Sequence, residues 1–239
     1  MGPTSPEVPI PAPMALLVIF STQVEMGPKM AGYIVDRMNA EGHNYKLYQP
    51  LASASCSIAY NADRVELLEK GYYSFTYGNN GGKGYTWGYF KVIATDEKFI
   101  SMSSHWEWQS GAEATQNREN QALEIVEKTK TLYETYNCPI FLGGDLNTTS
   151  ASTAFKNLTN GGYEYCFDIA EQKDNHSGRH PCDNKGFSRG SAGTNANAID
   201  HTLVYGLGES KVNAFKRCTP YFAIKLSDHY PLYVDVTLN

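Results

Sequence analysis

The sequence predicts an α/β protein with two packed sheets flanked by helices. Short apolar stretches that suit strands are interspersed with helical patterns along all 239 residues. Aromatic residues make up 13% of the chain, with 17 tyrosines, which is typical of β-rich proteins. No break in composition divides residues 14–239, so we expect one domain there. Residues 1–13 carry five prolines and are expected to form a disordered lead.

The expected strands are apolar or alternating stretches bounded by turn residues. In chain order they are 16–24, 45–48, 56–60, 65–68, 85–94, 98–103, 140–147, 198–205, 212–217 and 231–238. Residues 171–197 are polar, without periodicity, and rich in Gly, Asn and Ser, so we expect a long loop there.

Three helices are expected from apolar periodicity and end signals. The first spans 28–42, from a proline to a glycine. The second is long, and Ser110 with Glu113 fits a capping box at its start. Ser150 is expected to cap a short third helix that runs through Leu158.

Composition narrows the function class. The net charge of −5 and a pI near 5.7 argue against a general polyanion-binding surface, although metal ions can screen an acidic nuclease site. No apolar run reaches the ~18 residues of a membrane span. The apolar run at 14–20 is too short, and lacks the basic flank, for a signal peptide. We expect a soluble monomer, either cytoplasmic or secreted.

The five cysteines form no CxxC pair, which argues against a structural zinc site. Cys166 and Cys182 flank a polar segment, and a disulfide between them is expected only if the protein is secreted.

Polar residues follow the apolar strand at 140–147. Asp145 and Asn147 are two residues apart, so on an extended segment they share a face. Gly143 and Gly144 remove side-chain bulk where a ligand could approach the backbone. A carboxylate and an amide at a strand end suit a phosphoester with its metal ion. A turn with Asp and Asn as turn residues explains this fragment equally well.

Three further polar clusters lie at predicted strand ends, namely His105, Asp200-His201 and Asp228-His229. Taken singly, each is better explained without a function: His105 as a core histidine satisfied by a backbone group, and the other two clusters as turn residues or ion pairs. Lys83 lies in a glycine-rich loop, where a plain surface loop competes with a substrate contact.

Together and in this order, the clusters resemble the endonuclease/exonuclease/phosphatase superfamily, in its DNase-like and AP-endonuclease-like branches. The resemblance covers roughly residues 90–239, and SDHxP is its most specific part. The motifs are Ser103-Ser104-His105-Trp106, Gly144-Asp145-Leu146-Asn147, Ile199-Asp200-His201 and Ser227-Asp228-His229-Tyr230-Pro231-Leu232.

The resemblance implies a four-layer α/β sandwich and a divalent-metal-dependent hydrolase of phosphoester bonds. A nuclease-like phosphodiesterase is the first expectation. The alternatives are a lipid or inositol phosphate phosphoesterase, and a catalytically impaired binding module that keeps the fold. The implied cofactor is Mg²⁺, or Mn²⁺ or Ca²⁺, because the polar motifs offer carboxylate and amide oxygens.

The family pattern also implies roles for individual residues. His229 is the base, or the group that stabilises the phosphorane, and Asp200 holds its imidazole ring. Asp145 orients the nucleophilic water. Asn147 and His105 donate hydrogen bonds to the phosphate.

The metal ligands expected from the resemblance are Asp228 and Glu25, and Lys83 is an expected substrate contact. Ungapped alignment places Gln23, rather than Glu25, at the family's main metal carboxylate. Nothing before Met14 supplies the family's first strand, so we expect that strand to be missing. Two explanations compete: the chain is truncated at its start, or it is a degenerate family member with weak metal binding.

A nuclease should also present a basic or aromatic rim near its site. The candidate rim residues are Lys83, Tyr85, Trp87, Trp106, Trp108, Arg179, Lys185 and Arg189.

Overall fold

A computed structural model describes residues 20–24, 28–50, 56–78, 83–175, 182–183, 186–187, 194–217 and 229–239. The expected disordered lead, Glu25 and Asp228 lie outside the described residues. No helix in the described part of the chain is long and apolar enough to cross a membrane.

The elements follow the predicted order closely. The strands are β1 Phe20–Val24, β2 Tyr45–Tyr48, β3 Cys56–Asn61, β4 Val65–Ser74, β5 Gly84–Val92, β6 Lys98–His105, β7 Ile140–Asp145, β8 Tyr163–Tyr165, β9 Gln172–Lys173, β10 Cys182–Asp183, β11 Gly186–Phe187, β12 Asp200–Tyr205, β13 Lys211–Arg217 and β14 Leu232–Thr237. The helices are α1 Pro28–Ala40, α2 Ala112–Tyr136, α3 Thr153–Asn160, α4 Cys166–Ile169 and the 3₁₀ turn η1 Asn195–Asn197.

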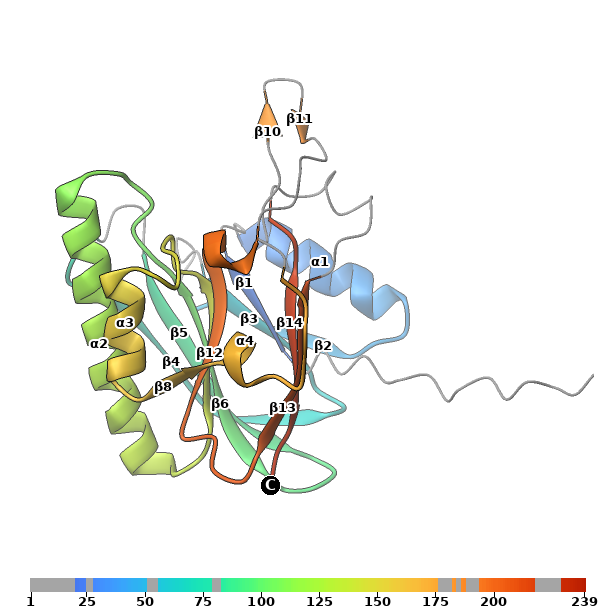
Figure 1. The fold of residues 1–239 in the computed structure, drawn as a ribbon. Coiled ribbons are helices and arrows are strands. Elements are labelled where there is room, and N and C mark those ends of the chain that lie inside the picture. The colour runs from blue at the N-terminus through green and yellow to red at the C-terminus, as the bar shows by residue number, and fades with distance from the viewer. Residues whose placement is uncertain are drawn as a thin grey trace, which may run out of the picture.

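A six-stranded sheet in the order β4-β5-β6-β7-β12-β8 forms the centre of the fold. β6 and β7 run parallel because the long helix α2 connects them, whereas the other neighbours are antiparallel. The apolar face of α2 is buried, and α2 also packs against α3. Both helices lie on one side of this sheet in Figure 1.

Two three-stranded sheets, β1-β3-β2 and β14-β13-β9, form the next layer. β1 contacts β6 and β7, and β12 contacts β14, so strands of both sheets meet the central sheet. Helix α1 packs against β2 and lies on the opposite side from α2 in Figure 1. The predicted four-layer α/β sandwich is therefore confirmed. The expected absence of the first family strand stays a prediction, because residues 1–19 are outside the described part.

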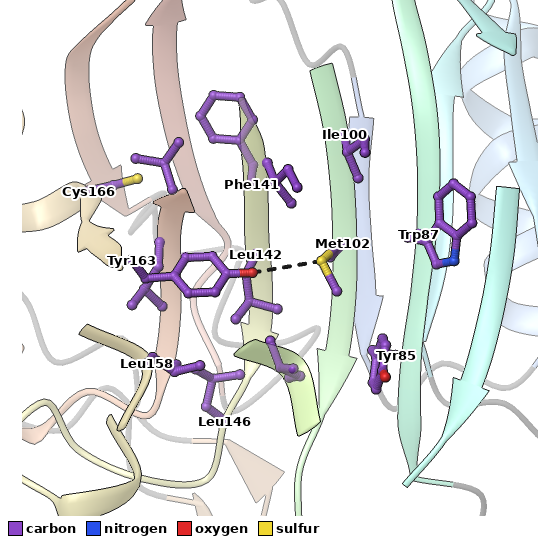
Figure 2. Close-up of a cluster of buried hydrophobic side chains, with 14 of the residues drawn as sticks. Tyr85, Trp87, Ile100, Met102, Phe141, Leu142, Leu146, Leu158, Tyr163 and Cys166 are labelled. Carbon is purple, nitrogen blue, oxygen red and sulfur yellow. Dashed lines mark hydrogen bonds between the residues drawn. The ribbon is translucent and has the colours of Figure 1, made fainter. Parts of the chain in front are cut away.

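The main core lies between the central sheet and its covering helices. Ile100, Met102 and Leu142 from β6 and β7 are fully buried, and Figure 2 shows them side by side. Tyr163 of β8 lies over them, with its hydroxyl 3.8 Å from the Met102 sulfur. The same hydroxyl is 2.6 Å from the Thr129 hydroxyl of α2, which supplies a second polar partner inside the core.

Two helix starts differ from the prediction. Helix α2 begins after Gly111, whose φ of 110° suits glycine, and no side chain caps it, so the Ser110–Glu113 capping box is wrong. Helix α3 is capped by Ser152, which accepts a hydrogen bond from the Phe155 N–H; the cap was predicted two residues too early.

Two further expectations need correction. The predicted loop at 171–197 contains the short strand β9, which pairs with β13, and the turn η1. Cys166 is a free, fully buried thiol, so it takes no part in the disulfide considered with Cys182.

Candidate functional site

Three neighbouring strands place three of the predicted site residues level with one another. His105, the last residue of β6, pairs with Asp145, the last residue of β7. Asp145 in turn pairs with Asp200, the first residue of β12. Adjacent strands are about 4.8 Å apart, so the three residues form a row across one end of the sheet. Neighbours in this row are 40 and 55 positions apart in the sequence, and strand order and register bring them together.

Asn147 lies in a turn rather than on a continued strand. Its φ is 48°, and its backbone N–H donates to Asp145 Oδ1 at 2.8 Å. The prediction that both side chains share a strand face is therefore wrong. The Asn147 amide nitrogen donates to the Trp106 carbonyl at 3.3 Å, which ties this turn to the segment after His105. The explanation of Asp145 and Asn147 as turn residues is therefore confirmed, and their role at a phosphoester site stays a prediction.

His229 completes the group from the C-terminal segment. Its Nδ1 is 2.7 Å from Asp200 Oδ2, and both side chains are about a fifth exposed or less. The carboxylate can only accept, so Nδ1 carries the proton and Nε2 is left as the ring's acceptor whenever the imidazole is neutral. This tautomer is the one that a histidine base requires.

His105 and Lys83 form a buried pair at the end of the row opposite Asp200 and His229. His105 is 2% exposed and Lys83 is 5% exposed. The Lys83 ammonium lies 2.9 Å from Nδ1 and 2.5 Å from Nε2 of His105. Burial, then the charges of Lys83 and His229, lower the pKa of His105 to about 3. His105 is therefore neutral at physiological pH, and Lys83 supplies the positive charge.

The described residues fit a divalent cation in part. Asp145, Asp200 and His229 each offer one ligand atom, and these atoms lie within 4.8 Å of one another. Asp200 and His229 are hydrogen-bonded to each other, so Asp145 is the carboxylate best placed to contribute. Carboxylate oxygens suit Mg²⁺, Mn²⁺ or Ca²⁺. The other predicted ligands, Asp228 and Glu25, fall outside the described residues.

His201 has a structural environment. It is fully buried, with Nε2 2.8 Å from the Thr148 carbonyl and Nδ1 3.0 Å from the Tyr165 hydroxyl. Because a carbonyl only accepts, Nε2 carries the proton and Nδ1 accepts from Tyr165. Burial lowers the pKa of His201 to about 4. His201 is therefore a buried histidine with both ring nitrogens hydrogen-bonded, and not one of the turn or ion-pair residues that the sequence suggested.

The low pKa of His201 predicts a pH-dependent stability. Between pH 4 and 6.5 the unfolded chain protonates this histidine and the folded chain does not, so the free energy of unfolding falls as pH falls. We expect His201 to contribute on the order of 1–3 kcal/mol to this fall. Urea unfolding at pH 7.5 and pH 5, in EDTA, measures it. His201→Gln should flatten the pH dependence, whereas the exposed-site control His43→Gln should not; equal slopes in all three proteins would contradict the assignment.

The predicted rim is mostly absent among the described residues. Tyr85, Trp87 and Trp106 are buried core residues, and Lys83 is buried beside His105. Trp108 is 63% exposed and follows the end of β6 closely. The three remaining candidates, Arg179, Lys185 and Arg189, lie outside the described residues.

Sequence reasoning missed three buried polar residues behind the site, namely Arg217, Asn195 and Tyr165. Arg217 donates to the backbone carbonyl of Asp200 at 3.2 Å and to Asn195 Oδ1 at 3.1 Å. An arginine at the end of an apolar strand was the only signal in the sequence. That signal does not identify the partner of Arg217, because one of its contacts is the backbone carbonyl of Asp200, a group that every residue has.

Comparison with known proteins gives matches only among solved structures. No family model matches the chain, and no curated protein matches it. A Bacteroides thetaiotaomicron endonuclease/exonuclease/phosphatase family protein is 17% identical with a TM-score of 0.70, covering 91% of this chain and 83% of its own. A mannosyl-6-phosphatase from the same organism is 18% identical with a TM-score of 0.65, covering 87% and 82%.

A third similar structure is TDP2 from D. rerio, complexed with a single-strand DNA product. It is 17% identical with a TM-score of 0.65, covering 91% of this chain and 84% of its own. At such identities the likeness concerns the fold, over nearly the full length of both chains. The chain therefore has the fold of the endonuclease/exonuclease/phosphatase family.

Proposed function

We propose that this protein is a member of that family and a divalent-metal-dependent hydrolase of phosphoester bonds, acting as a nuclease-like phosphodiesterase. The hydrogen bond between Asp200 and His229, with the Asp145 carboxylate beside it, is the observation that carries the proposal. A carboxylate-oriented imidazole next to a second carboxylate is what activation of a water molecule for attack on phosphorus requires.

In this mechanism Asp200 fixes His229 with its Nδ1 protonated. Nε2 then takes a proton from the attacking water, or holds a proton against the charge that develops on phosphorus. Asp145 orients the water, and Asn147 donates to a phosphate oxygen. A bound divalent cation, held by Asp145 with Asp228 and Glu25, would neutralise charge on the phosphate.

The pair of Lys83 and His105 supports phosphate binding on the opposite flank. The Lys83 ammonium is a donor only, and it lies within hydrogen-bond distance of both ring nitrogens of His105. The positive charge of Lys83 beside the neutral imidazole suits a phosphate oxygen at this end of the row.

A second candidate is a phosphomonoesterase. A monoester carries one more negative charge than a diester near neutral pH, and a buried ammonium beside the site favours that extra charge. The similar structures include a phosphatase as well as a protein with a DNA product, so both candidates have precedent in the fold. A catalytically impaired binding module is the third candidate.

A substrate panel tests the proposal. We expect bis-p-nitrophenyl phosphate and single- and double-stranded DNA to be hydrolysed with Mg²⁺ or Mn²⁺ and spared in EDTA. The panel also contains substrates of the alternative activities: p-nitrophenyl phosphate, RNA, sphingomyelin and inositol phosphates. Preference for the monoesters would transfer the assignment to the second candidate. If every substrate stays intact with both metals, the enzyme proposal fails and the binding-module candidate takes its place.

A further inference from the structure

A buried arginine lies directly behind Asp200. Arg217 ends β13, is 5% exposed, and donates through Nη2 to the Asp200 carbonyl and to Asn195 Oδ1. Its backbone N–H also donates to Asp174 Oδ2 at 2.7 Å. Burial holds the pKa of Arg217 below its ordinary value, and the nearby Asp200 carboxylate offsets part of this lowering. An arginine keeps its charge in a protein, so this buried cation depends on these particular partners.

A continuous series of hydrogen bonds runs onward from Arg217, and we call it the polar chain: Arg217, Asn195, Tyr165 and His201. Asn195 Nδ2 donates to the Tyr165 hydroxyl at 2.9 Å. That hydroxyl donates to His201 Nδ1, and His201 Nε2 donates to the Thr148 carbonyl. All four side chains are buried, and the donors and acceptors alternate without conflict.

The two ends of the polar chain donate hydrogen bonds to backbone carbonyls of the two segments that carry the candidate site. One end holds the backbone of Asp200, whose carboxylate orients His229. The other end holds the carbonyl of Thr148, which directly follows Asn147. The ladder between β7 and β12 ends at the pair Asp145 and Asp200, and the next residues are joined by one backbone hydrogen bond, from the Leu146 N–H to the Ile199 carbonyl at 2.9 Å. The polar chain adds a second connection between the two segments beyond this bond.

We propose that Arg217 is a positioning residue for the Asp200–His229 pair. Together with the rest of the polar chain, it fixes the distance between the segment that begins at Asp200 and the segment that contains Asn147 and Thr148. The inference rests on the proposed function and deepens it. Arg217 touches neither substrate nor metal in this scheme. It fixes the backbone from which Asp200 reaches His229, and a displacement near 1 Å at a catalytic group can cost about 100-fold in rate.

The test compares Arg217→Gln with Arg217→Lys, and uses the exposed Arg64→Gln as the matched control. We expect Arg217→Gln to lower kcat on bis-p-nitrophenyl phosphate by about 10- to 100-fold with KM within about twofold. Arg217→Lys should recover part of the loss because its ammonium keeps the charge and can still donate to the carbonyl. Arg64→Gln should match the native protein. Loss in KM alone, or equal kcat in all four proteins, would overturn the inference.

A spectroscopic measurement separates this inference from the proposed function. In metal-free protein, the His229 Nδ1 proton bound to Asp200 should give a protected, downfield proton resonance in NMR. We expect Arg217→Gln to broaden or remove this resonance and Arg64→Gln to retain it. If native protein hydrolyses no substrate, the proposed function fails, and the resonance alone decides the positioning role. Its persistence in Arg217→Gln would overturn that role.

Tyr165→Phe covers the case in which Arg217→Gln does not fold. This change removes one hydroxyl from the middle of the polar chain and keeps the ring. We expect a smaller drop in kcat in the same direction, again with KM unchanged. Where both variants fold, the fold-loss in kcat of the double variant should be smaller than the product of the two single fold-losses, because both changes interrupt the same series of hydrogen bonds. Unchanged kcat together with an unchanged His229 resonance in Tyr165→Phe would overturn the inference.

Discussion

His229→Ala is expected to lower kcat for phosphodiester hydrolysis by about 10²- to 10⁴-fold. The change removes the imidazole whose Nδ1 lies 2.7 Å from the Asp200 carboxylate. KM should change little, because the phosphate contacts proposed for His105, Lys83 and Asn147 remain. Steady-state kinetics on bis-p-nitrophenyl phosphate with Mn²⁺ measures both constants.

The matched control for this variant is His43→Ala, since His43 is exposed and belongs to the segment before β2. It should leave kcat and KM unchanged. A His229→Ala protein that is folded and retains more than about a tenth of the native kcat would show that the imidazole is neither base nor transition-state donor.

Gly144→Ala is expected to destabilise the fold by about 3–5 kcal/mol. A Cβ at this position would overlap the carbonyl oxygen of Ser104 on the neighbouring strand β6, and the φ of 143° lies where side chains are strained. The backbone atoms of two central strands cannot move apart without breaking the sheet. Urea unfolding measured by circular dichroism should show the midpoint falling steeply.

Gly32→Ala in α1 is the control, because a Cβ there meets nothing within 4 Å. It should stabilise the protein by about 0.5–1 kcal/mol, since alanine favours helix over glycine. If Gly144→Ala has the same midpoint as the native protein, the close approach of β6 and β7 at the site is wrong.

The glycine at 144 shows how far sequence reasoning reached. The pair of glycines before Asp145 was interpreted as a place where a ligand could approach the backbone closely. The sequence alone did not reveal that the approaching group at Gly144 is the neighbouring strand β6 rather than a ligand. Strand order decides this, and β6 is separated from β7 by the whole of α2.

Local patterns predicted most elements because apolar periodicity and end signals act over a few residues. The helix α1 and the strands β2 and β3 were predicted within a residue or two. Helix starts were less certain, since Gly111 and Ser152 compete with nearby residues of similar capping ability. β8 and α4 are too short to show a period, and neither was predicted.

The candidate site was predictable to the extent that its residues belong to recognisable motifs. His105, Asp145, Asp200 and His229 converge, as the combined motifs required. Arg217 had no such signal, because it acts through a backbone carbonyl that every residue possesses.

A double-mutant cycle between Asp200 and His229 tests the central claim most directly. Asp200→Asn keeps the shape but removes the charge that holds the Nδ1 proton, so it should lower kcat strongly by itself. If the two residues act as one unit, the double variant Asp200→Asn/His229→Ala should be no slower than His229→Ala, within about threefold. Asp235→Asn, an exposed aspartate on β14, should have no effect. Losses that multiply in the double variant would contradict the account.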